Sequence, residues 1–153
     1  MSSNITATLP SVPQVQAGNI PDILKGLSQW IVWRIGPLKA NGKFDKVPVD
    51  PQTGRHINAH DPQHWLSFAD AIAAHRAGKG SGIGIVMSAS QPIEMDGESY
   101  YLIGLDFDRC RDRMDKLKKL HELLGRPYVE VSPSGKGLRM FALSKQPLKG
   151  GNR

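Results

Sequence analysis

An apolar run that ends in two aspartates, Tyr101 to Asp108, is the part of this sequence that most constrains its fold. The run is rich in residues that favour strands, and successive side chains of a strand point to opposite faces. Leu105 and Phe107 therefore share one face, which we expect to pack into a core, and Asp106 and Asp108 share the other. The run predicts a strand that is buried on one side and carries two neighbouring carboxylates on the opposite side.

The length and composition fit one globular domain with a basic surface. The 153 residues are enough for a single hydrophobic core, and 39% apolar with 22% charged residues is ordinary for such a domain. Twenty Lys and Arg against 14 Asp and Glu leave a net charge of +6. This charge is consistent with a polyanionic partner such as nucleic acid but does not identify one.

The cysteine count and the hydropathy pattern indicate a cellular compartment. Cys110 is the only cysteine, so an internal disulfide is impossible and a reducing compartment is favoured. No apolar run approaches the roughly 20 residues that span a bilayer, and the N-terminus lacks the pattern of a signal peptide. We therefore expect a cytoplasmic protein with no membrane partner.

The rest of the chain alternates strand and helix patterns, which predicts an α/β fold of the α+β type, with a mixed sheet flanked by helices. A helix is expected to begin at Pro62, after the cap Asp61, and to end at Gly78, whereas residues 88–99 are predicted to form a polar loop. The other expected strands cover residues 30–35, 46–49, 83–87, 128–132 and 138–143, and the other expected helices cover residues 21–27 and 112–124.

The predicted organisation is one domain with two loose ends. Residues 1–19 lack hydrophobic periodicity and are expected to form a flexible leader. Residues 20–145 would form the domain, and residues 146–153 a loose C-terminal tail.

The two aspartates at the end of the 101–108 strand are a candidate metal site. Two carboxylates on one face repel each other unless a cation lies between them, and oxygen ligands suit Mg²⁺ or Mn²⁺. Magnesium often takes one or two carboxylates together with substrate phosphates, which is the arrangement that nucleotidyl transfer needs. The alternative is a strand that simply ends in solvated acids.

A loop of small residues around Lys136 is a candidate phosphate site. Gly135 and Gly137 permit close backbone approach, and the N–H groups of such a loop can surround an anion. Lys136 adds a positive charge, and Ser132 and Ser134 add hydroxyl donors. The spacing is not that of a Walker A loop, so an ordinary hairpin loop is the alternative.

Two further patterns were weighed. Glu130 lies two residues before Ser132 on the same expected strand, so it could add a third carboxylate or pair with a basic residue. His56, His60 and His64 are spaced by four residues, but the proline between the last two interrupts any helix through them, so a zinc site is not expected.

Several segments, taken in order, resemble the N-terminal catalytic domain of phage- and plasmid-type primase-polymerases in the archaeo-eukaryotic primase superfamily. Residues 104–108, Gly-Leu-Asp-Phe-Asp, and residues 130–139, which contain Ser-Pro-Ser-Gly-Lys-Gly, carry most of the resemblance. The order and approximate spacing agree over residues 28–143. The other matching segments are residues 30–34, 46–48, 50–55, 61–68 and 82–86.

The resemblance implies a fold, an activity and roles for individual residues. It implies the primase fold and a template-directed DNA primase and polymerase activity in plasmid, phage or mobile-element replication. Asp106 and Asp108 would hold the catalytic Mg²⁺ or Mn²⁺, and Lys46 would face the nucleotide or the template. The residues implied in binding the nucleotide phosphates are Ser132, Ser134, Gly135, Lys136, Gly137 and Arg139.

The sequence departs from this family in two places. The family's histidine falls at Arg139, and arginine can hold phosphate but does not exchange protons near neutral pH. The family also has a further acidic motif after the loop, and none follows here before Arg153. We therefore expect a truncated N-terminal part of the catalytic domain, with an incomplete metal site.

The expected partners are a DNA template and nucleoside triphosphates, with a helicase of the same replication system as a further partner. Whether this chain is itself an enzyme stays open from its sequence. A non-catalytic DNA- or nucleotide-binding module derived from the same fold would fit the same residues, and so would a basic structural domain of unrelated function.

Overall fold

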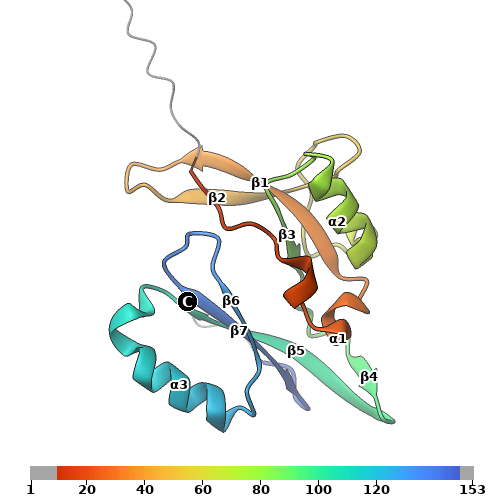
Figure 1. Ribbon diagram of the computed structural model, residues 1–153. Coiled ribbons are helices and arrows are strands. Elements are labelled where there is room, and N and C mark those ends of the chain that lie inside the picture. The colour runs from red at the N-terminus through yellow and green to blue at the C-terminus, as the bar shows by residue number, and fades with distance from the viewer. Residues whose placement is uncertain (1–9, 149–153) are drawn as a thin grey trace, which may run out of the picture.

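Two antiparallel β-sheets build the part of the chain that the computed structural model describes, residues 10–148 (Figure 1). The first sheet has the strand order β2-β1-β3, and the second has the order β4-β5-β7-β6. The strands are β1 (Trp30–Leu38), β2 (Phe44–Val49), β3 (Gly82–Ile85), β4 (Ile93–Met95), β5 (Glu98–Phe107), β6 (Tyr128–Val131) and β7 (Leu138–Ser144). The helices are α1 (Asp22–Lys25), α2 (Phe68–Arg76) and α3 (Met114–Leu123), with 3-10 helices η1 (Ala17–Asn19), η2 (Pro62–His64) and η3 (Cys110–Arg113).

The combination of helices and strands confirms the predicted α and β composition, but the prediction of a single mixed sheet is wrong. Every strand pair is antiparallel, and the strands fall into two separate sheets. A sequence pattern shows which residues are extended, whereas long-range side-chain packing selects the partner strand. Here β1 is the central strand of one sheet, and β5 and β7 are the inner strands of the other.

Helix α3 covers one face of the four-stranded sheet. Leu117 of α3 packs against Met140 of β7, and Leu105 and Phe107 of β5 lie against the same cluster. This packing confirms the core face that the alternation in residues 101–108 predicted. The opposite face of β5, which carries Asp106, is turned away from α3.

The second face of the four-stranded sheet shares a core with the three-stranded sheet. Leu102 of β5 and Phe141 of β7 belong to the same buried cluster as Trp30 and Val32 of β1. Asp106 lies four residues after Leu102 in the same strand, and therefore on the same face. Burial of these apolar side chains thus places the Asp106 carboxylate beside the space between the two sheets.

The predicted helix from Pro62 to Gly78 is divided in two. The Asp61 carboxylate accepts a hydrogen bond from the Gln63 backbone N–H, as predicted for a cap, but the 3-10 helix that it caps ends at His64. Leu66 then exchanges backbone hydrogen bonds with Trp30, at 2.8 and 3.1 Å. The Leu66 N–H and carbonyl are bonded to Trp30, so they cannot join a helix. A new helix, α2, therefore begins after Ser67, whose side chain accepts a hydrogen bond from the Asp70 N–H.

The predicted polar loop of residues 88–99 contains a hairpin instead. Strands β4 and β5 pair through the turn Asp96-Gly97, in which both residues have positive φ, 53° and 77°. This is the backbone geometry that Asp-Gly favours in a two-residue hairpin turn. The Asp-Gly dipeptide is the local sequence signal for this hairpin, and the prediction of a loop did not use it.

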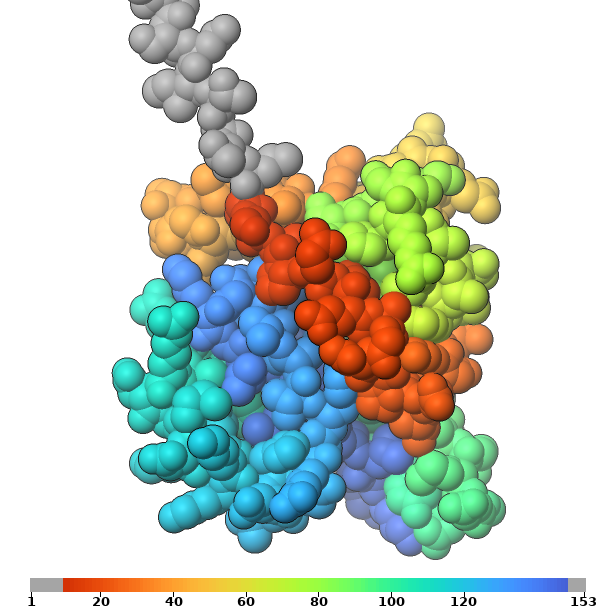
Figure 2. Space-filling model, viewed as in Figure 1, coloured from red at the N-terminus to blue at the C-terminus, as the bar shows by residue number. Residues whose placement is uncertain are grey.

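The chain before α1 runs along the boundary between the two sheets (Figures 1 and 2). Ile20 and Leu24 are buried in the main core, and the Trp30 indole Nε1 donates to the Leu24 carbonyl at 3.0 Å. Part of the predicted leader is therefore described, including η1, whereas residues 1–9 of it lie outside the described residues, as do residues 149–153 of the predicted tail. Across residues 10–148, no helix is long and apolar enough to cross a membrane.

Candidate nucleotide and metal site

Three charged residues form a row across β5, β7 and β6. The strand register places Arg139 of β7 opposite Asp106 of β5 on one side and opposite Glu130 of β6 on the other. Directly opposed residues of antiparallel strands share a face, so all three side chains project from the face that is turned away from α3. The row brings together three residues that the sequence analysis had named separately.

Arg139 and Asp106 form an ion pair within this row. The Arg139 Nε donates to Asp106 Oδ1 at 2.6 Å. The arginine side chain is 23% exposed, whereas the aspartate side chain is 61% exposed. The carboxylate is therefore open to solvent on one side, while its partner is largely held within the protein.

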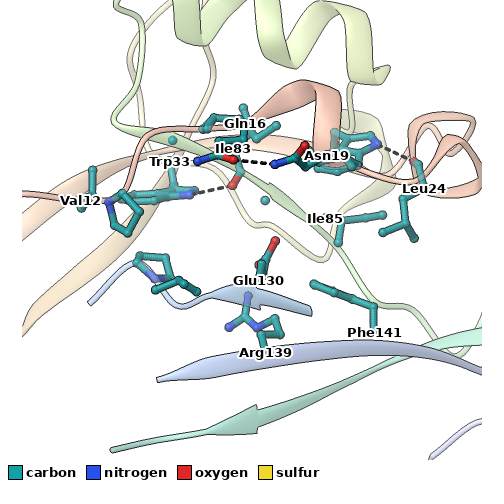
Figure 3. Close-up of a pocket in the computed structure, with 18 of the residues that line it drawn as sticks. Val12, Gln16, Asn19, Leu24, Trp33, Ile83, Ile85, Glu130, Arg139 and Phe141 are labelled. Carbon is teal, nitrogen blue, oxygen red and sulfur yellow. Dashed lines mark hydrogen bonds between the residues drawn. The ribbon is translucent and has the colours of Figure 1, made fainter. Parts of the chain in front are cut away.

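Lys46 approaches the row from the other sheet. It lies on β2, and it lines a cavity of about 460 Å³ between the two sheets together with Glu130 and Arg139. Figure 3 shows Glu130 and Arg139 at one side of this cavity, across from Trp33 and Asn19. The lysine and the arginine thus face one space from two separate sheets.

Burial has opposite effects on the two ionisable groups that flank Arg139 in this cavity. Desolvation lowers the pKa of the Lys46 ammonium, with the positive charge of Arg139 as the next cause, while Asp106, Glu130 and Asp108 raise it. Desolvation also raises the pKa of the Glu130 carboxyl, against the opposing effects of Arg139 and Lys46. Lys46 is exposed overall, so solvent moderates its shift, whereas Glu130 is half-buried and its carboxyl is the more poorly solvated of the two groups.

The N-terminal segment closes part of this cavity. Residues 12–16 and Asn19 line it, and Figure 2 shows the segment, coloured red, lying along the front of the molecule between the two sheets. The sequence analysis assigned these residues to a leader and gave them no part in the site. Their composition, Val-Pro-Gln-Val-Gln, carries no periodic pattern that would have placed them.

Trp33 forms an apolar side of the cavity. Its indole Nε1 donates to the Ile83 carbonyl at 3.0 Å, and the ring is almost fully buried. A Cβ on Gly82 would lie 2.5 Å from the Trp33 ring carbon Cζ2, so only glycine lets the ring lie this close to β3. Gly82 thus lies directly against an aromatic ring.

The loop between β6 and β7 is held by its own hydrogen bonds. The Gly135 N–H donates to the Ser132 carbonyl, the Lys136 N–H to Ser134 Oγ, and the Gly137 N–H to Ser132 Oγ, at 2.8, 3.3 and 3.2 Å. An anion could bind the Lys136 and Gly137 N–H groups only by displacing the two serine hydroxyls, and the Gly135 N–H is already bonded to a backbone carbonyl. The Lys136 side chain remains exposed at the end of the loop.

Gly137 fixes the loop against the end of β5. A Cβ at this position would lie 2.5 Å from the Phe107 carbonyl oxygen and 3.4 Å from the Asp108 Cα. The missing side chain therefore allows the loop to approach the residues that follow Asp106. This contact brings the candidate phosphate loop beside the candidate metal residues.

Asp108 lies just beyond β5, which ends at Phe107. The position of the Asp108 side chain is therefore set by a turn and not by the strand alternation from which it was predicted. Arg109 follows in the left-handed conformation, with φ of 46°, which is uncommon for a residue other than glycine. Asp108 and Asp106 both raise the pKa of Lys46, because each negative charge favours the charged ammonium.

The described residues could supply two carboxylates to a metal site but do not form a fully protein-bound one. Residues 10–148 contain no group of three or more His, Cys, Asp or Glu side chains placed to hold an ion. Mg²⁺ can be bound by one or two carboxylates when substrate phosphates and water complete its coordination. Asp106 and Asp108 suit that arrangement, provided that Asp106 is released from Arg139.

Comparison with known proteins found sequence similarity to a phage protein. No protein-family model matches this chain. The chain is 27% identical over 126 residues to a DNA primase-polymerase of Nitratiruptor phage NrS-1, an alignment that covers 81% of this chain and 16% of the phage protein. The alignment thus spans less than a fifth of the relative's length.

Proposed function

We propose that this chain forms the metal- and nucleotide-binding part of a DNA primase-polymerase. The observation that carries the proposal is the row Asp106–Arg139–Glu130 beside a cavity that Lys46 also lines. Arg139 connects the two parts of the site, because it pairs with Asp106, a candidate ligand for a divalent ion, and lines the cavity together with Lys46. The similarity to the phage DNA primase-polymerase supports the same class of function.

In this proposal, Asp106 and Asp108 hold Mg²⁺ or Mn²⁺, and the cations of the site hold the phosphates. A bound divalent ion would supply activation of a 3′-hydroxyl and neutralisation of phosphate charge. Arg139 and Lys46 contact phosphate oxygens from the two sheets, and Lys136 contacts them from the loop. Ser132 and Ser134, with the N–H groups of Lys136 and Gly137, complete the phosphate contacts once the hydroxyls turn from the loop toward the anion, while Gly135 supplies the turn that presents them.

The cavity would take the nucleoside part of the substrate. Its volume of about 460 Å³ is within the range of roughly 300–1,000 Å³ that is usual for small-molecule sites. Trp33 and the N-terminal segment provide apolar walls. Glu130 is proposed to hold Arg139 in the row, because it lies directly opposite the arginine and is half-buried.

The reaction would be transfer of a nucleotide to a DNA primer. The 3′-hydroxyl oxygen bonds to the α-phosphorus, the bond between the α-phosphorus and the bridging oxygen breaks, and pyrophosphate leaves while the hydroxyl proton passes to solvent. Primer synthesis and primer extension on a DNA template test the proposal, with this chain and with any longer natural form compared in Mg²⁺ and Mn²⁺. A longer, folded form with intact aspartates that shows neither activity would contradict it.

A non-catalytic DNA- or nucleotide-binding module is the second candidate function. The ion pair between Arg139 and Asp106 favours this candidate, because the arginine occupies one of the two carboxylates that a metal would need. The net charge of +6 also favours a DNA-binding module. DNA affinity that falls steeply with salt but is unaffected by Mg²⁺ and by Asp106→Ala would support this candidate. DNA affinity that depends on the metal and on Asp106 would exclude it.

A further inference from the structure

The Arg139–Asp106 ion pair lies where two ligands of opposite charge are proposed to bind. Among the described residues, Arg139 is the one whose side chain donates to the Asp106 carboxylate. A metal ion needs that same carboxylate, and a phosphate group needs that same guanidinium. In the structure the two groups satisfy each other, so each is withheld from its proposed ligand.

The surrounding charges oppose either ligand arriving alone. A divalent cation at Asp106 would lie beside Arg139 and near Lys46, and a guanidinium cannot relieve the repulsion by losing a proton. A polyphosphate at Arg139 would lie beside Asp106, with Glu130 on the other side. A metal ion and a polyphosphate that arrive together remove both conflicts, because the metal replaces the arginine at Asp106 and the phosphate replaces the aspartate at Arg139.

The strand geometry keeps the exchange local. Arg139 lies on an inner strand between two carboxylate-bearing strands, and its side chain is 23% exposed. When Arg139 leaves Asp106, Glu130 still lies directly opposite it, so the guanidinium stays in the row and faces the cavity. The exchange needs a small movement of one side chain and no change in the sheet.

We propose that the Arg139–Asp106 ion pair is a latch that couples metal binding to polyphosphate binding in this chain. The inference rests on the proposed function, since it assigns Asp106 to the metal and Arg139 to phosphate. It goes further by making each ligand dependent on the other. Such coupling is reciprocal by thermodynamic linkage, so the latch predicts an effect on the metal and an equal effect on the nucleotide.

The first test measures Mn²⁺ binding without nucleotide, by electron paramagnetic resonance of the free ion. Arg139→Gln is expected to bind Mn²⁺ about tenfold more tightly than the wild type, a value within the range of roughly 5- to 150-fold usual for coupled sites. Lys145→Gln is the matched control, because Lys145 forms an ion pair with Glu98 at the far end of β5. The control is expected to leave Mn²⁺ affinity unchanged.

The second test measures the reciprocal effect on a fluorescent deoxynucleoside triphosphate in the presence of EDTA. Asp106→Asn frees Arg139 and is expected to tighten metal-free nucleotide binding by about the same factor as in the first test. Asp108→Asn removes the same charge, and no hydrogen bond from Arg139 to Asp108 is found in the described residues, so a smaller gain is expected. Circular dichroism establishes that each variant is folded, and Arg139→His replaces Arg139→Gln if the latter is unfolded.

The outcomes separate the latch from the proposed function. If the wild type binds Mn²⁺ and Arg139→Gln binds it with the same affinity, the latch is overturned and the metal site is retained. Equal gains in metal-free nucleotide affinity in Asp106→Asn and Asp108→Asn would also overturn the latch, because loss of general repulsion between carboxylate and phosphate would then explain both gains. Absence of Mn²⁺ binding in every folded variant, even with nucleotide present, would overturn the proposed function and the latch with it.

Discussion

Two ion pairs connect the same two strands, β5 and β7, at opposite ends, and their surroundings differ. At one end Arg139 pairs with Asp106, and the arginine is 23% exposed. At the other end Lys145, just after β7, contacts Glu98 at 2.8 Å, and the two side chains are 63% and 53% exposed. The sheet geometry is shared, so the differences between the pairs come from what lies around them.

The ionisable groups at the two ends are shifted for different reasons. Hydrogen bonds from Lys145 and then from Tyr100 lower the pKa of Glu98, so its charged form is favoured. Near Arg139, desolvation raises the pKa of Glu130 and lowers the pKa of Lys46, so the charged forms of both are disfavoured. Groups held in unfavourable charge states beside a cavity are typical of functional sites, whereas a solvated pair is typical of an ordinary surface.

Removal of one carboxylate from each end gives the largest predicted contrast. Asp106→Asn should reduce primer extension by at least about 100-fold, a loss comparable to removing one group that stabilises transition-state charge. Glu98→Gln should leave the rate unchanged, because Glu98 lies at the opposite end of the strand. Steady-state primer extension by an active form checks both, and a similar loss in the two variants would contradict the difference in role.

A methyl group added near each end of β5 tests how tightly the backbone is packed there. Gly137→Ala would place a carbon 2.5 Å from the Phe107 carbonyl oxygen, and overpacking of this kind costs about 1–3 kcal/mol. Gly97→Ala, in the hairpin turn before β5, meets no atom within 4 Å and should cost about 1–2 kcal/mol, from its positive φ alone. Urea unfolding measures both free energies, and only Gly137→Ala should also weaken nucleotide binding.

Substitution of Lys46 separates the stability of the site from its binding function. Desolvation lowers the pKa of its ammonium, so the charged form is disfavoured in the folded state, and Lys46→Met should leave the folded protein equally or more stable. The same change removes a proposed phosphate contact and should weaken nucleotide binding about tenfold, as loss of one charge-assisted hydrogen bond implies. Thermal unfolding and nucleotide titration measure the two effects, and loss of both together would contradict the separation.

The smallest effects are on stability, and their dependence on pH should have opposite signs at the two ends. The pKa of Glu130 is raised in the folded protein, so ionisation of this carboxyl destabilises the fold at any pH above the ordinary glutamate pKa of 4.5. Glu130→Gln should therefore raise the melting temperature at pH 7, and the gain should vanish as the pH falls below that value. Lys145→Gln removes the hydrogen bond that lowers the pKa of Glu98, so it should slightly lower the melting temperature at pH 7, with the loss vanishing in acid.

Much of the fold was predictable where one segment of sequence carries its own pattern. The Asn41-Gly42 sequence favours a hairpin turn and Asp61 favours a cap, because both signals depend on neighbouring residues. Both features are present: the Lys39 N–H bonds to the Lys43 carbonyl at 2.7 Å, and Asp61 accepts from Gln63. The interruption of the helix at Leu66 could not be predicted, because the backbone partner of Leu66 is Trp30, distant in the sequence. Contacts of that kind depend on the whole chain.

The candidate site divides in the same way. The sequence alone determined that residues 101–107 lie in a strand with Leu105 and Phe107 on its core face, because strand alternation is a local property of the backbone. Only the tertiary structure decided that Arg139 lies between Asp106 and Glu130, that Lys46 faces them from another sheet, and that residues 12–16 line the same cavity. The physical reason is that strand pairing and sheet packing depend on the burial of apolar side chains from the entire chain, and charged side chains are brought together as a consequence.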